Sequence, residues 1–188
     1  MNWTTYTSLF EEIISKENTT TPYDNENYYN YVSLNHSRQN RWLKRGAITE
    51  EFKSQIENIS EAQEWILITE PWCGDAAHLA PFIQKASELN DNINLTINLR
   101  DGEDSLIQDY LTNGKSMSIP ILVVRNKNGT DLFSWGPRPS DAQAILARQK
   151  EETDKTPEEH KIEFQGWYNK NKGVDVQNEL LEKFKSLG

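Results

Sequence analysis

The stretch Glu70-Pro71-Trp72-Cys73-Gly74-Asp75-Ala76-Ala77 decides the fold of this chain, and it holds the chain's only cysteine, Cys73. A short apolar run, residues 66–69, comes directly before it and suits a buried central strand. Apolar residues at helical spacing follow it from Leu79 onward. The pattern therefore predicts a strand, a tight turn and a helix whose first turn contains Cys73.

This stretch resembles the active-site turn of the thioredoxin-like family, with Ala76 at the position of the second cysteine. Pro81 stands where thioredoxins carry the proline that kinks the active-site helix. Ser118-Ile119-Pro120 resembles the family's cis-proline loop, and Gly136 falls where the family keeps a glycine. The resemblance covers about residues 61–150. The chain also resembles a bacterial subgroup with Trp-Cys-Gly-Asp at this turn and a helical leader before it.

The fold class expected from these features is α/β, thioredoxin-like, with a mixed central sheet flanked by helices on both faces. Residues 93–99 alternate with period two, as a strand with one drier face does. A helix with Leu106, Ile107, Tyr110 and Leu111 is expected next, which favours a parallel strand pair. The turn Asn128-Gly129 between two apolar runs predicts an antiparallel hairpin.

Both ends of the chain are expected to add helices to this fold. We predict a helical N-terminal extension over residues 1–60, a thioredoxin-like core over 61–150 and a helical C-terminal extension over 151–188, all packed as one domain. The first extension should hold three helices, over the first 16 residues, over about 24–44 and after a cap at Thr49. Aromatic residues in both extensions are expected to be buried, namely Tyr28, Tyr31, Trp42, Trp167 and Tyr168.

The composition limits the classes of partner. The chain has 188 residues, with 29 acidic against 20 basic side chains, so its average surface repels a phosphate backbone and no nucleic-acid partner is expected. No run of about 18 apolar residues and no basic, apolar leader is present, so neither a membrane partner nor secretion is expected. We expect a cytoplasmic protein in which a lone thiol stays reduced. No metal or other cofactor is expected, because no zinc or calcium motif is present.

The candidate catalytic residue is Cys73. At the first turn of a helix, a thiolate is favoured by unpaired backbone N–H groups and by the helix dipole. Asp75 opposes this, because a nearby negative charge disfavours the thiolate. The resemblance also implies a proton-transfer carboxylate six residues before the cysteine, where this chain has Leu67.

The resemblance implies a substrate groove, in which an extended peptide binds to backbone beside the cis-proline. Its expected members, besides Cys73, are Trp72, Gly74, Asp75, Ile119 and Pro120. The loop 135–139 should approach the same edge. Arg138 is the one cation expected near the groove, although a solvated loop arginine is the commoner outcome, and Trp135 is as consistent with core packing as with the groove.

Two other kinds of site are not favoured. His78 lies five residues after Cys73, about 140° around a helix, so it should leave on a different face and not serve as a catalytic base. Monothiol glutaredoxins have Cys-Gly-Phe-Ser at their turn and a Gly-Gly-x-Asp element for glutathione, and neither is found here. An iron–sulfur cluster is therefore not expected.

The hypothesis for function is monothiol thiol–disulfide chemistry. A dithiol enzyme attacks a disulfide with one cysteine and releases the mixed disulfide with the other, so Cys73 alone needs an external thiol to finish the cycle. The partners would be a protein or small-molecule disulfide substrate and that external thiol. Two alternatives stay open: a thioredoxin-fold binding module that performs no redox step, and a redox sensor in which Cys73 is the oxidised target.

Overall fold

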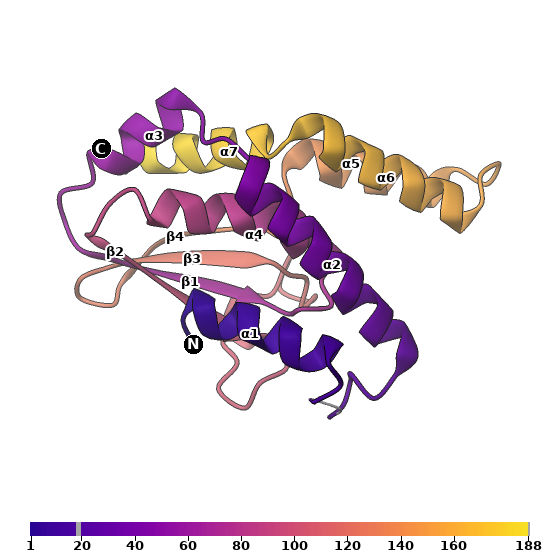
Figure 1. Ribbon diagram of the computed structural model, residues 1–188. Coiled ribbons are helices and arrows are strands. Elements are labelled where there is room, and N and C mark those ends of the chain that lie inside the picture. The colour runs from indigo at the N-terminus through magenta and orange to yellow at the C-terminus, as the bar shows by residue number, and fades with distance from the viewer. Residues whose placement is uncertain (18–19, 188) are drawn as a thin grey trace.

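A computed structural model of the chain describes residues 1–17 and 20–187 (Figure 1). Its helices are α1 (Trp3–Ile14), α2 (Glu26–Arg45), α3 (Glu50–Glu57), α4 (Gly74–Ser87), α5 (Ser140–Glu151), α6 (Pro157–Asn171) and α7 (Val174–Lys185), with one 3-10 helix, η1 (Ile107–Tyr110). Its strands are β1 (Gln63–Thr69), β2 (Ile93–Leu99), β3 (Ile121–Asn126) and β4 (Asp131–Trp135). The three helices expected before the first strand are thus present, and the chain ends in a further helical segment.

The four strands form one mixed sheet in the order β2-β1-β3-β4. β1 pairs in parallel with β2, with Leu67 opposite Ile97, and antiparallel with β3, with Leu67 opposite Leu122. β3 and β4 form an antiparallel hairpin whose turn contains Gly129 at a positive φ of 78°. The expected mixed sheet flanked by helices is confirmed.

The two faces of the sheet have separate apolar cores. Trp65, Leu67 and Leu122 belong to the larger core, which also receives buried side chains from all seven α-helices. Ile66 and Val123, which alternate with them along the strands, face a smaller core that includes Cys73, Ala76, Ile107 and Ile119. Because side chains alternate across a strand, one apolar run supplies both cores.

The prediction of a helix with Leu106, Ile107, Tyr110 and Leu111 is correct only in part. Ile107–Tyr110 forms the short 3-10 helix η1, whose Ile107 packs in the smaller core. The Asn98 side chain accepts from the Leu106 amide at 2.9 Å and donates to the Asp104 carbonyl at 2.9 Å. These bonds hold the backbone of the preceding loop in a turn, so few residues are left for a helix before the next turn at Asn113 and Gly114, both at positive φ.

The C-terminal segment packs on the rest of the chain. Figure 1 shows α7 beside α3, and α6 extending past the sheet. Val176, Leu180 and Phe184 of α7 are buried in the larger core. Gly173, just before α7, has a φ of 74°, and an added Cβ would collide with the Phe82 ring of α4.

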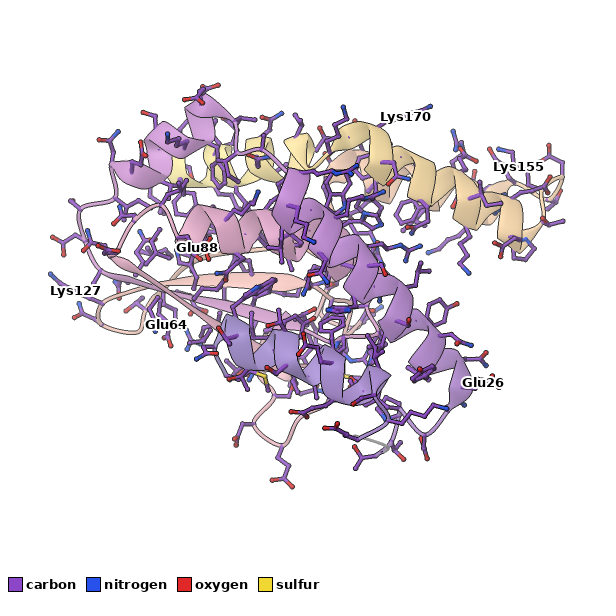
Figure 2. The ribbon with its side chains drawn as sticks, viewed as in Figure 1. Glu26, Glu64, Glu88, Lys127, Lys155 and Lys170 are labelled. Atoms are coloured by element: carbon purple, nitrogen blue, oxygen red, sulfur yellow. The ribbon has the colours of Figure 1, made fainter. Side chains whose placement is uncertain are left out.

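The expected burial of the extension aromatics is partly wrong. Trp42 and Tyr168 are buried and Trp167 is half-buried, but Tyr28 and Tyr31 are 38% and 44% exposed. The buried side of α2 is formed by other residues, namely Val32, Asn35, Gln39 and Trp42. The two tyrosines instead open on the cleft described below. Labelled charged side chains such as Glu26 and Lys155 lie at the outer limits of the molecule in Figure 2.

Candidate active site

Cys73 is the N-cap residue of α4, and its side chain is buried, with 6% of it exposed. The Sγ accepts from the Ala76 amide at 3.5 Å, and the thiol proton points to the Ile119 carbonyl oxygen, with Sγ and O 3.4 Å apart. The Ile119–Pro120 peptide bond is cis. The turn and the proline loop, 46 residues apart, therefore meet at the sulfur.

The loop after β4 closes against the same proline. Gly136 has a φ of 133°, and a Cβ added there would collide with the Pro120 carbonyl oxygen. A glycine is thus required where these two loops approach each other. The approach carries Arg138 toward the turn, as the sequence indicates, whereas Trp135 is buried and donates from Nε1 to Glu179 of α7 at 2.7 Å.

A cleft of about 700 Å³ opens over the sulfur. Five of the six predicted site residues line it, namely Trp72, Cys73, Gly74, Asp75 and Ile119. Pro120 is buried and is not part of the lining. The remaining wall comes from α2, from α6 and from the loops that carry Arg100, Ser116–Ser118 and Arg138.

Asp75 is fixed by partners from two distant segments. Its Oδ2 accepts from Nε of Arg138 at 2.6 Å, and the two side chains form an ion pair. Its Oδ1 accepts from the Tyr168 hydroxyl of α6 at 2.7 Å. The carboxylate beside the cysteine is therefore held in place by the loop after β4 and by α6.

The thiol of Cys73 is strongly protonated at neutral pH. Burial of the sulfur, followed by the negative charge of Asp75, raises its pKa to about 12. The amide of Ala76 and the Arg138 cation act in the opposite direction and are outweighed. The sequence shows the helix N-terminus and Asp75 in opposition, but burial, which it does not show directly, decides the outcome.

His78 is bound by neighbours on both of its ring nitrogens and makes no hydrogen bond with Cys73 among the described residues. Trp42 donates from Nε1 to its Nδ1 at 2.9 Å, so its Nε2 carries the proton and donates to Oε1 of Gln165 at 2.8 Å. Its ring stacks on Tyr168 with centroids 4.4 Å apart. Burial lowers the pKa of His78 to about 4. Both nitrogens are engaged and the ring is neutral, so a structural role fits it.

Sequence reasoning missed a buried carboxylate, Glu70, at the end of β1. It accepts from the Tyr23 hydroxyl at 3.1 Å and from the Asp101 amide at 2.9 Å, and burial raises its pKa. The second bond fixes the turn that presents Arg100, whose guanidinium lies 4.5 Å from the Trp72 ring centroid. An acidic residue that closely follows the apolar run 65–68 is the signal available in the sequence.

Other groups that bind ions or span membranes are not found in the described residues. Within residues 1–17 and 20–187, no three His, Cys, Asp or Glu side chains are grouped so that they could hold a metal ion. In the same part of the chain, no helix is long and apolar enough to cross a membrane.

Comparisons with known proteins agree with this geometry. A family model described as thioredoxin matches residues 22–183. No curated protein matches the chain. Among solved structures, a protein of unknown function from Pseudomonas aeruginosa is similar with a TM-score of 0.60 at 17% identity, over 85% of this chain and 91% of that one. An HIV epitope-scaffold is similar with a TM-score of 0.60 at 17% identity, over 84% and 90%. At this low sequence identity, both similarities support the fold and nothing beyond it.

Proposed function

The chain belongs to the thioredoxin family, and we propose that it carries out thiol–disulfide exchange with a single thiol, that of Cys73. The observation that supports this is the placement of the sulfur at the start of α4, at the bottom of a cleft and against the Ile119 carbonyl. Within the family we assign the chain to the group with a Trp-Cys-Gly-Asp turn and a helical leader. We place it in the cytoplasm, where small thiols are available.

The proposed reaction has two exchange steps. The Cys73 thiol loses its proton to water, and the thiolate attacks one sulfur of a disulfide R–S–S–R. The S–S bond breaks, a Cys73–S–S–R bond forms, and the other half leaves as a thiolate that takes up a proton from water. An external thiol, as its thiolate, then attacks the sulfur of the R group; the bond to Cys73 breaks, a disulfide of R with the external thiol leaves, and the Cys73 sulfur takes up a proton. Ala76 offers no sulfur for release from within the turn.

The high pKa of Cys73 makes this reaction selective. With a pKa of about 12, the thiolate fraction at pH 7 is roughly 10⁻⁵, against about 3% for an ordinary cysteine. A more basic thiolate is also a stronger nucleophile, which raises the rate per thiolate roughly 40-fold and offsets part of this loss. Cys73 is therefore expected to react about a hundredfold more slowly than a free thiol with dissolved disulfides. Only a disulfide held in the cleft gains the effective concentration that compensates.

A second candidate function is binding without a redox step, and the protonated state of the thiol favours it. The thiol hydrogen already has an acceptor in Ile119, so the sulfur can serve as part of the cleft floor. The same protonation argues against a redox sensor, because oxidation by peroxide needs an exposed thiolate. Cys73 is buried instead.

The test is adduct trapping by mass spectrometry with the reduced full-length protein. We expect disulfides to form an adduct on Cys73 that persists until an external thiol is added, and then disappears at a rate proportional to the thiol concentration. The variant Ala76→Cys should shorten the adduct's lifetime, and Cys73→Ser should form none. No adduct with any disulfide, at any pH up to 10, would leave the binding function in place of the redox one.

A further inference from the structure

The cleft over Cys73 carries a charge opposite to that of the whole protein. The chain has a net charge of −9. Four cations nevertheless line the cleft, from Arg38, Arg100, Arg138 and Lys161, against one carboxylate in the lining, Asp75. A concave wall focuses the field of its own charges, so the excess of cations in the lining outweighs the average surface there, even though the exposed Asp101 and Glu158 lie beside Arg100 and Lys161.

Part of this positive charge lacks a carboxylate partner in the described residues. Arg138 is paired with Asp75, and Arg100 is paired with the exposed Asp101 beside the cleft. Arg38 is different. Among residues 1–17 and 20–187 its guanidinium donates to the Asn35 side-chain oxygen at 3.1 Å and makes no ion pair. Burial and the neighbouring Arg41 lower its pKa, and the negative charge of Asp75 offsets part of this effect.

Lys161 of α6 completes the cationic wall. Its ammonium lies 5.4 Å from the Tyr31 ring centroid, and its carboxylate neighbour, Glu158, is 3.8 Å away and exposed. Tyr28 meets Trp72 edge to face with centroids 5.9 Å apart. The cleft thus combines apolar ring surfaces with cations around one sulfur, within the volume of about 700 Å³ that is usual for small-molecule sites.

We propose that the cleft is a binding site for a small disulfide that carries carboxylates, with Arg38 and Lys161 as its anion-binding residues and Cys73 as its reactive group. This inference rests on the proposed function and names its substrate class. One carboxylate would supply the ion-pair partner that Arg38 lacks among the described residues, the other would replace the exposed Glu158 beside Lys161, and the rings would cover the carbon chain. The sulfur–sulfur bond then lies over Cys73, and the exchange step proceeds as written above: one half of the disulfide joins Cys73 and the other leaves as a thiolate carrying a carboxylate.

The test compares three disulfides of similar length and different charge. Dithiodipropionate is a dianion, bis(hydroxyethyl) disulfide is neutral and cystamine is a dication. The rate of adduct formation on Cys73 is measured for each disulfide and divided by the rate at which the same disulfide reacts with N-acetylcysteine amide. This ratio removes the differences in leaving group among the three disulfides. We expect the ratio for the dianion to exceed that for the dication about tenfold or more at low salt, and the difference to shrink as salt is added.

A matched pair of variants locates the effect. Arg38→Gln should lower the dianion ratio about threefold or more and leave the neutral disulfide nearly unchanged. Arg45→Gln is the control, because Arg45 changes the net charge equally from the exposed end of the same helix, outside the cleft lining. Equal ratios for the three disulfides, or equal effects of the two variants, would overturn the inference.

A redox-inert probe separates the inference from the proposed function. Suberate matches dithiodipropionate with carbon in place of sulfur, and its binding is followed by calorimetry and by tryptophan fluorescence. Saturable binding that Arg38→Gln weakens, with no adduct from any disulfide, would support the anion site and refute exchange by Cys73. Adducts with no charge preference and no suberate binding would support exchange and refute the anion site.

Discussion

The substitution Asp75→Asn tests what keeps the Cys73 thiol protonated. The carboxylate is the largest cause of the raised pKa of Cys73 after burial itself. Asparagine keeps the shape and still offers an oxygen to the Tyr168 hydroxyl, which donates to Asp75 at 2.7 Å. Arg138 keeps its charge and loses its partner. The variant should therefore lower the pKa of Cys73.

The size of the effect follows from the contacts. A neighbouring charge shifts a pKa by about 1–3 units, and burial of the sulfur is unchanged, so we take about 1 unit. The thiolate fraction at pH 7 then rises about tenfold, and the lower basicity costs about threefold in nucleophilicity. Alkylation of Cys73 at pH 7 should thus become about threefold faster.

Iodoacetamide alkylation, followed by mass spectrometry from pH 7 to 10, measures this change. Asp91→Asn is the matched control, since Asp91 is exposed and its loss changes the net charge equally. Circular dichroism checks that both variants fold. Equal rates in the two variants would refute the assigned role of Asp75, and a wild-type rate that levels off below pH 9 would refute the high pKa of the thiol.

Three further predictions concern stability. Burial lowers the pKa of His78 to about 4, so between pH 6.5 and 4 this histidine binds a proton in the unfolded chain but stays neutral in the folded one. The free energy of unfolding should therefore fall by about 3 kcal/mol over this range because of His78. Urea titrations of His78→Gln should show a smaller fall in the free energy of unfolding over the same pH range. Gly173→Ala forces a Cβ onto Phe82 at a positive φ, so it should cost about 2 kcal/mol or more, whereas Gly166→Ala, with open space around its Cβ, should raise stability by up to about 1 kcal/mol. In limited proteolysis the core and both extensions should resist digestion together, as one cooperative unit. A stable fragment of about residues 61–150, with both ends rapidly digested, would contradict this.

Much of the fold could be predicted because its signals are local. The alternation in residues 93–99, the turn Asn128-Gly129 and the turn around Cys73 each specify an element from adjacent residues. The helix expected near residue 107 is only partly present because the Asn98 side chain takes over the backbone groups of the loop that follows β2. These hydrogen bonds come from a residue outside the segment around residue 107, so the spacing of apolar residues within that segment does not reveal them.

The site could be predicted only as far as the family resemblance reaches. Trp72, Asp75 and Ile119 fall within residues 61–150, and all three line the cleft. Arg38 and Lys161 lie in the two extensions, where neither motif nor spacing connects them to Cys73. The protonation of the thiol likewise depends on burial by several segments at once, which no single stretch of sequence displays.

The bond from Tyr168 to Asp75 spans 93 residues of the chain, and this makes the active-site turn a poor candidate for transplantation. An eight-residue turn moved into another protein would bring its cysteine and carboxylate but leave behind the hydroxyl of α6 and the guanidinium that hold that carboxylate. The acidity of the thiol would then be set by the recipient. Conversely, replacements in α6 offer a way to change the reactivity of Cys73 while every residue from 70 to 77 stays as it is.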